Sequence, residues 1–163
     1  MQQEFSSIIE AHKAKIFKIC LGFSVDADQA KDLFQDSCVN IWKSLDNFQG
    51  KSAIATWIYR ITVNTCLLHK RKSKTQKEIF FADLPDKTGF VQHTEQPALE
   101  ENLQLLYTFI RTLKESDRAI IMLYLEGLSY KEMEEVLGIS VNNLGVRLNR
   151  IKKTLKTKFA QHG

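Results

Sequence analysis

The sequence contains few residues that interrupt or cross-link a chain. Its 163 residues include only two prolines, seven glycines and three cysteines. Few prolines leave room for helices, and an odd number of widely spaced cysteines does not suggest a disulfide framework. We expect Cys20, Cys38 and Cys66 to be reduced residues of the protein core.

Long apolar runs are absent as well. No stretch approaches the roughly 20 consecutive apolar residues that cross a bilayer, and the N-terminal segment MQQEFSSIIEAHK lacks the basic-then-apolar order of a signal peptide. We therefore expect a cytoplasmic protein that is not itself inserted in a membrane. Glycine-rich phosphate loops and nucleophile motifs are also lacking, so the sequence indicates no catalytic residue and no cofactor.

The charged residues form blocks of one sign, although the net charge is only +4. Residues 69–77 hold five Lys or Arg and no acid, and residues 141–163 hold six Lys or Arg and no acid. Between them, residues 78–106 carry six acids against the single Lys87. Basic clusters on helices are typical of contacts with a polyanion, although a solvated basic face has the same composition.

Apolar residues in the first half of the chain recur at steps of three and four, which predicts amphipathic helices. The first helix covers about residues 4–22, and the second ends at about Leu45. The third follows the turn DNFQGKS, has Ser52 as its N-cap and ends within residues 70–74. Three such helices can bury one another, which predicts a small domain over residues 1–73.

The helical pattern lapses over residues 74–98, where acids are scattered and prolines break the regularity. We expect a flexible acidic linker there. The pattern resumes in a second helical domain over residues 99–163, in which Ser116 is expected to cap a short apolar helix. No strand-like period competes with these helices, so the sequence predicts an all-α fold of two small domains.

The second domain contains the pattern of a helix-turn-helix. Ser129 and Glu132 form an S-x-x-E capping box for a short helix, and Gly138 stands where a left-handed residue ends it. A longer basic helix then begins near Asn142 or Asn143. A short helix, a tight turn with glycine and a second helix are typical of DNA-binding domains.

The basic helix has the width to enter the major groove of DNA, where N-terminal residues reach base edges and later cations reach phosphates. A helical hairpin with a solvated basic face is the alternative interpretation. On the first interpretation the candidate base contacts are Asn142, Asn143, Val146, Asn149 and Arg150, and the candidate backbone contacts are Arg147, Lys153 and Lys156.

Aromatic and cationic side chains are interleaved around the third predicted helix. The rings are Phe48, Trp57 and Tyr59, and the cations are Lys51, Arg60, Lys70 and Arg71. Ring faces beside cations are suited to holding the unstacked bases of a single strand. Trp57 falls on the apolar stripe, so we expect it to pack in the core, whereas the roles of Phe48 and Tyr59 stay open.

Two parts of the chain resemble the extracytoplasmic-function sigma factors of bacterial RNA polymerase. The runs DLFQDSCVNIWKSLDNF and SAIATWIYRITVNTCLLHKRK resemble their region 2, and LKESDRAIIMLYLEGLSYKEMEEVLGISVNNLGVRLNRIKKTLK resembles their region 4. Both stand in the family's order, with an acidic segment between them. The resemblance implies an alternative sigma factor that binds core polymerase, directs promoter recognition, local DNA melting and transcription initiation, and is not an enzyme.

The resemblance also implies roles for particular residues. The second helix, with Asp32, Gln35 and Asp36 above Trp42, would dock on the clamp helices of the polymerase β′ subunit. The loop over residues 48–54 would capture a base flipped from the minus-10 element. The residues implied in minus-10 binding are Phe48, Lys51, Ser52, Ile54, Arg60, Asn64 and Lys70.

Region 4 would place its last helix in the major groove of the minus-35 element and its upper surface on the β flap. The linker would thread the active-centre cleft, an ordinary solvated linker being the alternative. Family members are usually restrained by an anti-sigma factor, so such a partner is also implied. The variant NNLGVRLNRIKK, with Gly145 and Asn149, is similar to the form common in Bacteroidota, so promoter preferences do not transfer from better-known relatives.

Two other functions fit parts of the sequence. A free-standing helix-turn-helix regulator explains the C-terminal half but gives the first half no role. A metal or redox enzyme would use Cys66 and His69, which lie three residues apart on a predicted helix. Zinc sites take three or four protein ligands, and only this pair is suggested locally.

Overall fold

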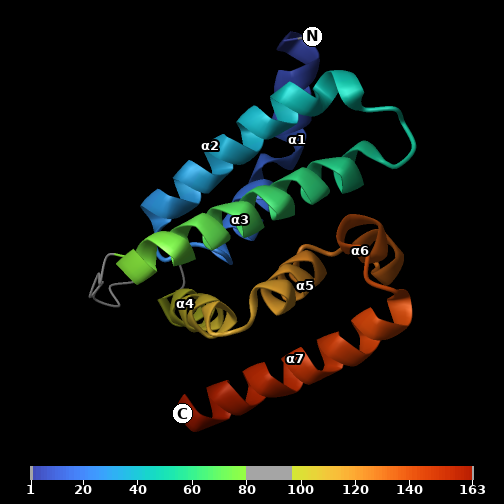
Figure 1. Cartoon of the computed structure of the whole chain (residues 1–163). Helices are drawn as coiled ribbons and strands as arrows, with labels where there is room; N and C mark the ends of the chain where they lie inside the picture. Colours follow the sequence, from blue (N-terminus) through green and yellow to red (C-terminus); the bar gives the residue numbers. More distant parts are fainter. Residues whose placement is uncertain (1, 80–96, 163) are drawn as a thin grey trace.

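A computed structural model describes residues 2–79 and 97–162, with side chains for residues 3–69 and 100–162 (Figure 1). Over these residues the predicted all-α fold is confirmed. The elements are α1 (Gln2–Leu21), α2 (Ala27–Ser44), the short 3-10 helix η1 (Leu45–Asn47), α3 (Ile54–Ile79), α4 (Pro97–Arg111), α5 (Glu115–Leu125), α6 (Tyr130–Leu137) and α7 (Val141–His162). None of these helices has the length and apolarity required to cross a membrane.

Helices α1, α2 and α3 pack against one another as the first helical unit. Each contributes side chains with no more than 1% of their surface exposed, such as Ile19 from α1, Leu33 from α2 and Ile58 from α3. Burying a side chain of this size stabilises the fold by roughly 1.5–3 kcal/mol relative to leaving it in water. The apolar periodicity of the first half therefore identifies the faces that meet.

The cap of α3 differs from the sequence prediction. Ser52 is not the N-cap: the first helical hydrogen bond runs from the Trp57 N–H to the Ala53 carbonyl at 3.2 Å, so Ala53 takes that position. At α2 the acidic start does act as a cap, because the Asp26 carboxylate accepts a hydrogen bond from the Gln29 N–H at 2.7 Å.

Helix α3 is also longer than predicted. It continues to Ile79 instead of ending within residues 70–74. Lys and Arg are good helix formers, and residues 54–80 contain no Gly or Pro, so a basic run is no reason for the helix to stop. The predicted linker over residues 74–98 lies mostly outside the described residues, and its two described ends are helical.

The second unit, α4 to α7, contains the predicted helix-turn-helix in α6 and α7. The Ser129 hydroxyl accepts a hydrogen bond from the Glu132 N–H at 3.1 Å, and the Glu132 carboxylate accepts one from the Ser129 N–H at 2.9 Å. Gly138 follows α6 with φ at 72°, in the left-handed region that favours glycine. The capping box and the glycine stop are therefore both confirmed.

The starts of α5 and α7 show where local sequence misleads. Ser116 lies inside α5 and does not cap it; Lys114 takes the cap position without a side-chain hydrogen bond. Helix α7 begins at Val141, slightly before the predicted start, and the Ser140 hydroxyl accepts a hydrogen bond from the Asn143 N–H at 3.2 Å.

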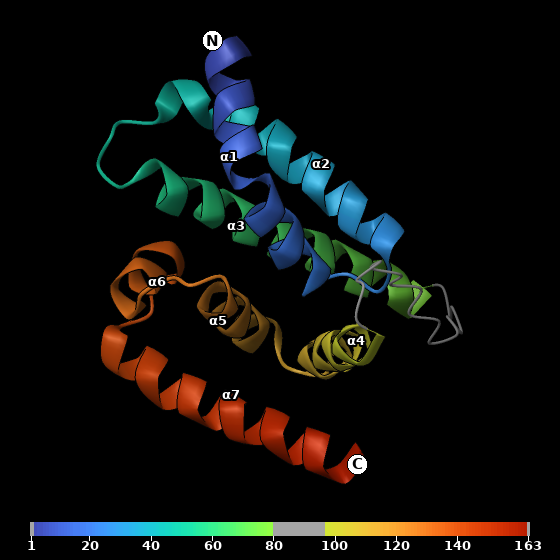
Figure 2. The same cartoon turned by 180° about the vertical axis from the view of Figure 1, so that it is seen from behind.

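The two helical units pack directly on each other, with α1 against α5 and α3 against α6 (Figure 1 and Figure 2). One close fit is between Gly22, which directly follows α1, and Met122 of α5. A Cβ atom on residue 22 would lie 2.5 Å from Cγ and Sδ of Met122, whose side chain is 1% exposed. One hydrophobic cluster includes buried residues of both units, so their cores are continuous.

Candidate nucleic-acid and protein-binding surfaces

Seven of the eight candidate DNA contacts on α7 are exposed, and six of them share one face of the helix. Spacings of three and four place residues on the same side of a helix, and the opposite side of α7 is buried through Leu144, Leu148, Ile151 and Leu155. This exposed face, called the α7 stripe below, consists of Asn142, Asn143, Val146, Asn149, Arg150 and Lys153.

The remaining candidate, Arg147, points to α5 instead. Its guanidinium donates to the Asp117 carboxylate at 2.8 Å and to the Ser116 hydroxyl at 2.6 Å. The Arg147 and Asp117 side chains are 27% and 13% exposed, so the ion pair is partly shielded from water. Arg147 therefore fixes α7 against the start of α5, a tertiary role that the basic pattern of α7 does not reveal.

Tyr124 and Tyr130 both lie beside α7. The Lys152 ammonium sits 4.2 Å from the centre of the Tyr124 ring, and its hydrogen bond to Tyr124 is the main cause of a raised Lys152 pKa. At Gly145, an added Cβ would meet only Tyr130, at 3.8 Å, which is an ordinary contact distance. Packing therefore does not require glycine at this position.

Helix α2 carries a second continuous exposed face. Asp32, Gln35 and Asp36 are all exposed, and Trp42 keeps 41% of its surface exposed. Val39, 48% exposed, lies between them at helical spacing. Asp32, Gln35, Asp36, Val39 and Trp42 are called the α2 face below. Helical spacing alone would have identified Val39 from the sequence as a member of this face.

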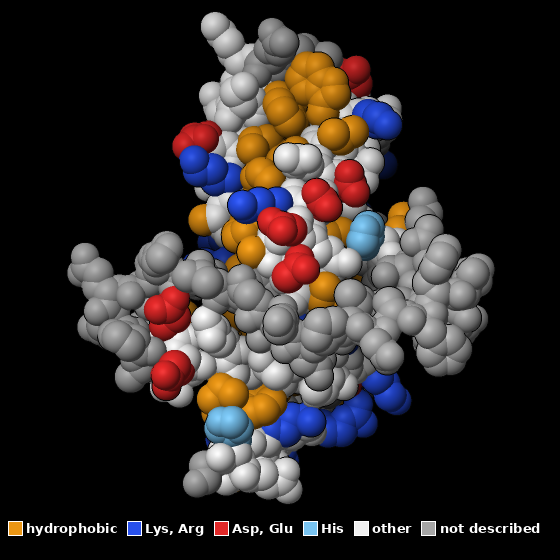
Figure 3. Space-filling view, turned by 90° about the vertical axis from the view of Figure 1, so that its left-hand side faces the viewer, with side chains coloured by type: hydrophobic (Ala, Val, Ile, Leu, Met, Phe, Trp, Pro, Cys, Tyr) orange, Lys and Arg blue, Asp and Glu red, His pale blue; other side chains and the backbone are white. Residues whose placement is uncertain are grey.

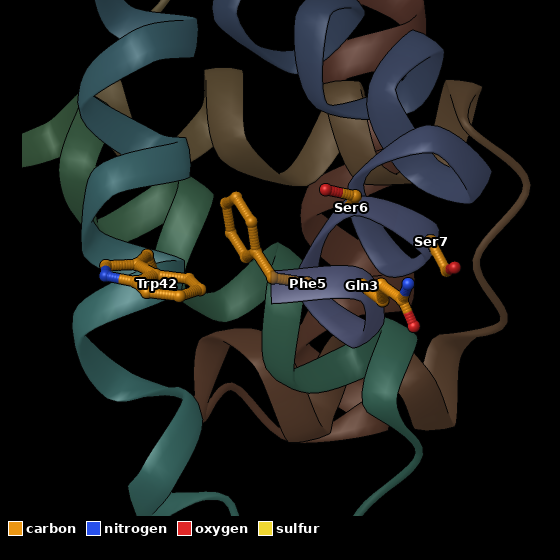
Figure 4. A pocket seen from close by; sticks show the side chains of 5 residues that line it. All are labelled: Gln3, Phe5, Ser6, Ser7 and Trp42. Atoms are coloured by element: carbon orange, nitrogen blue, oxygen red, sulfur yellow. The ribbon is translucent and has the colours of Figure 1, made fainter. Parts of the chain in front are cut away.

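Trp42 borders a hollow between α1 and α2. Its ring packs edge-to-face against Phe5 of α1, with the ring centres 5.0 Å apart. Gln3, Ser6 and Ser7 of α1 line the rest of the hollow (Figure 4). In the space-filling view, hydrophobic side chains gather at this end of the molecule above a group of acidic side chains (Figure 3). The contact of Phe5 with Trp42 is tertiary, so helical spacing does not predict it.

The residues implied in minus-10 binding fall into two groups. At the start of α3, the Phe48 and Trp57 rings lie 5.1 Å apart, both half-buried, with Lys51 exposed and Ser52 half-buried beside them in the sequence. Ile54 packs against the hydrophobic core. Trp57 also packs against that core, as predicted from its place on the apolar stripe.

Further along α3, Arg60 and Asn64 are exposed and lie one turn apart; they are called the α3 face below. The Arg60 guanidinium donates a hydrogen bond to the backbone carbonyl of Glu135, on α6. In this arrangement the Arg60 guanidinium is therefore bound to the second helical unit. Lys70 belongs to α3, but its side chain lies outside the described side chains.

The open question about Tyr59 is settled by its burial. Its side chain is 3% exposed, and its hydroxyl lies 3.3 Å from Nδ1 of His12 on α1. Burial raises the pKa of Tyr59 and, together with Lys15, lowers that of His12. Tyr59 is a core residue that joins α3 to α1 and presents no ring to a nucleic acid.

The cysteines converge inside the first unit. Cys20 and Cys66 are buried with their sulfurs 4.0 Å apart, whereas Cys38 is only half-buried, which departs from the core prediction. The pKa of Cys66 is raised by its contact with Cys20 and by burial, and burial raises that of Cys38 to about 11. Such thiols stay protonated and unreactive at neutral pH.

Among the described residues, no three His, Cys, Asp or Glu side chains form a group able to hold a metal ion, so Cys66 and His69 gain no partner ligands there.

Family models match most of the chain. The model for sigma-70 region 2 matches residues 8–76, which include the α2 and α3 faces. The model for sigma-70 region 4 matches residues 103–155, which include the α7 stripe.

Curated relatives are similar over nearly the full chain. The extracytoplasmic-function sigma factor SigW of Bacillus subtilis is 27% identical over 168 residues, covering 97% of this chain and 90% of that protein. The extracytoplasmic-function sigma-E factor of Escherichia coli is 26% identical over 167 residues, covering 96% of this chain and 87% of that protein.

Solved structures share the fold. The sigma factor RpoE of Bartonella quintana, solved with the anti-sigma factor NepR, is 20% identical, with a TM-score of 0.77 over 97% of this chain and 98% of that one. CnrH, solved with the cytosolic domain of CnrY, is 20% identical, with a TM-score of 0.74 over 100% of this chain and 92% of that one. With both regions matched in order and relatives aligned along the chain, this protein belongs to the extracytoplasmic-function sigma factors of RNA polymerase, the sigma-70 family members that direct transcription initiation.

Proposed function

We propose that this sigma factor binds its partners through three surfaces: the α2 face, the α3 face with the loop before it, and the α7 stripe. The chain supplies specificity and catalyses no reaction itself, and it acts in the cytoplasm, where it meets polymerase and promoter. The observation that carries the proposal is the α7 stripe, because its amide and cationic groups point outward from a helix whose other side is buried.

The α2 face binds the clamp helices of the β′ subunit. One end of this face is apolar, through Val39 and Trp42, and the other end is acidic, through Asp32 and Asp36. Protein interfaces combine apolar and polar contacts, and the acids favour a partner with basic residues at the matching positions.

The role of the α2 face is tested by neutralising its acids. We expect the double variant Asp32→Asn with Asp36→Asn to bind core polymerase about tenfold more weakly, mainly through slower association at low salt. Glu101→Gln, the same chemical change at an exposed position of α4, is the control and leaves binding unchanged. Equal binding of the double variant and the wild type would remove the assignment.

The minus-10 element meets the loop before α3 and then the α3 face. Phe48, half-buried against Trp57, offers a ring against which an unstacked base can lie, with Lys51 beside it for the phosphates. Arg60 and Asn64 lie about two turns further along the helix. Phe48→Ala is expected to reduce promoter opening, measured by permanganate reactivity of minus-10 thymines, while polymerase binding is retained.

The minus-35 element meets the α7 stripe in the major groove. Asn pairs with adenine and Arg with guanine through two hydrogen bonds, so Asn142, Asn143 and Arg150 carry suitable groups. Lys153, one turn further along α7, suits a phosphate. Arg150→Ala should change which sequences are transcribed, whereas a uniform loss on all promoters would identify Arg150 as a phosphate contact.

We include an anti-sigma factor among the partners. The RpoE structure was solved with the anti-sigma factor NepR, and the CnrH structure with the cytosolic domain of CnrY. A protein that holds the two units together would cover the α3 face, where α6 already lies. This part of the proposal is tested by copurifying a partner with the chain from its native host. Removal of that partner should then start transcription in an assay with core polymerase.

The function as a whole is tested by binding to core polymerase that lacks any sigma factor. The purified chain is expected to elute together with the core in gel filtration, and the Asp32 and Asp36 double variant to separate from it. A chain that does not bind core polymerase but binds DNA tightly alone would instead be a free-standing regulator.

A further inference from the structure

Val146 is an apolar side chain in an otherwise polar stripe. It keeps 70% of its surface exposed, more than any other large apolar side chain among those the structure describes as exposed. Four other apolar residues of α7, Leu144, Leu148, Ile151 and Leu155, are buried. A single exposed valine requires no explanation by itself, so the position of Val146 within the stripe decides its meaning.

Val146 lies at the centre of the α7 stripe. With about 3.6 residues per turn, Asn142 and Asn149 fall to one side of it and Asn143 and Arg150 to the other. The surface that these longer polar side chains can reach is therefore the surface that Val146 faces. A short side chain between long ones also contacts a ligand only where the helix itself comes close.

The rotation of α7 about its axis is fixed, so Val146 cannot turn inward. Leu144 and Leu148, on the opposite side, are fully buried. Arg147, the next residue, is held by the Asp117 carboxylate at 2.8 Å and the Ser116 hydroxyl at 2.6 Å. Both sets of contacts keep the valine pointing outward.

The chemistry of the major groove leaves one matching group. The base edges there carry hydrogen-bond donors and acceptors, together with the C5-methyl group of thymine. A valine placed against a donor or acceptor leaves that group without its water, which is unfavourable. Against a thymine methyl group, the same side chain removes two apolar surfaces from water.

We propose that Val146 reads the methyl group of one thymine in the minus-35 element and so sets the base preferred at that position. The inference rests on the proposed contact of the α7 stripe with this element. It adds the recognition of a thymine methyl group, which the proposed contacts of Asn with adenine and of Arg with guanine do not include.

The test removes or adds only the methyl group. Holoenzyme assembled from core polymerase and the full chain is bound to its promoter, in which each minus-35 thymine is replaced in turn by uracil and each cytosine by 5-methylcytosine. For the wild type we expect one thymine-to-uracil change to weaken binding about fourfold. Val146→Ala should bind the thymine and uracil promoters equally.

Val141→Ala is the matched control. Val141 is on the same helix and 38% exposed but lies off the stripe, so this variant should keep the fourfold preference for thymine. A uracil effect that persists in Val146→Ala, or wild-type binding that no minus-35 methyl group affects, overturns the inference while leaving the sigma function intact. Holoenzyme with no sequence preference at minus-35 would instead overturn the proposed role of the α7 stripe, and the inference with it.

Discussion

Arg147 and Arg150 stand one turn apart on α7 but meet different surroundings. Arg147 is joined to Asp117 and Ser116, whereas Arg150 is exposed on the α7 stripe. A basic helix in a sequence suggests that all its cations face the same polyanion. The structure separates a cation that orients the helix from one that is available to DNA.

This difference predicts opposite effects of the same substitution. Arg147→Ala should lower the free energy of unfolding by about 1 kcal/mol, because it removes a partly shielded ion pair and a hydrogen bond. Arg150→Ala should leave stability within about 0.5 kcal/mol and change promoter choice. Urea denaturation of both variants checks the first effect. Equal stability of the two variants would show that the Arg147 contacts contribute nothing to α7.

Glu132 gives stability a dependence on pH. Its hydrogen bonds with Ser129, above all the one from the backbone N–H, hold the Glu132 pKa below its ordinary value of 4.5. A carboxyl whose pKa is lowered by folding stabilises the protein above the unfolded pKa, and this stabilisation is lost as pH falls through the folded pKa.

We therefore expect the wild type to exceed Glu132→Gln in stability at pH 7, and the difference to shrink below about pH 4.5. Chemical denaturation of both proteins between pH 7 and pH 3 measures it. A difference that stays constant over this range would contradict the assignment of the charge to the capping box.

At the scale of elements, Gly145 weakens α7 without a packing reason. Glycine costs up to about 1 kcal/mol relative to alanine inside a helix, and an added Cβ here meets only Tyr130 at 3.8 Å. Gly145→Ala should therefore raise the free energy of unfolding by about 0.5–1 kcal/mol in a denaturation experiment. A loss of stability would mean that the Tyr130 ring cannot accept the methyl group.

Elements were predictable from the sequence where their signal is local. The apolar period of the first half, the Ser129 and Glu132 capping box and the Gly138 stop all depend on residues within a few positions of each other. The predicted caps at Ser52 and Ser116 were wrong, because a serine near a helix start caps it only if the chain enters at that residue. The same limit explains why the tie of Arg147 to α5 was not foreseen.

At the scale of the whole molecule, the packing of the two units is the feature least visible in the sequence. The α2 face and the α7 stripe follow from helical spacing alone. The fit of Met122 against Gly22 and the Arg60 contact with Glu135 join residues far apart in the chain, and no periodic pattern encodes them. For Arg60 to meet DNA, α6 must move away from α3.

The Gly22 contact gives this arrangement a direct test. Gly22→Ala places a methyl group 2.5 Å from the buried Met122 side chain, and such overpacking typically costs about 1–3 kcal/mol. We expect small-angle scattering to show a larger radius of gyration for Gly22→Ala, and the double variant with Met122→Ala to return toward the wild-type value. Gly145→Ala is the control that leaves the radius unchanged. Unchanged scattering of Gly22→Ala would mean that this contact does not hold the units together.

The most direct test of the account is transcription by core polymerase with and without the chain, on a library of genomic fragments from the same organism, with the start sites mapped. The account predicts new start sites at a limited set of promoters that share two sequence elements at a fixed spacing, and their loss with the Asp32 and Asp36 double variant. Start sites identical to those of core polymerase alone would contradict it.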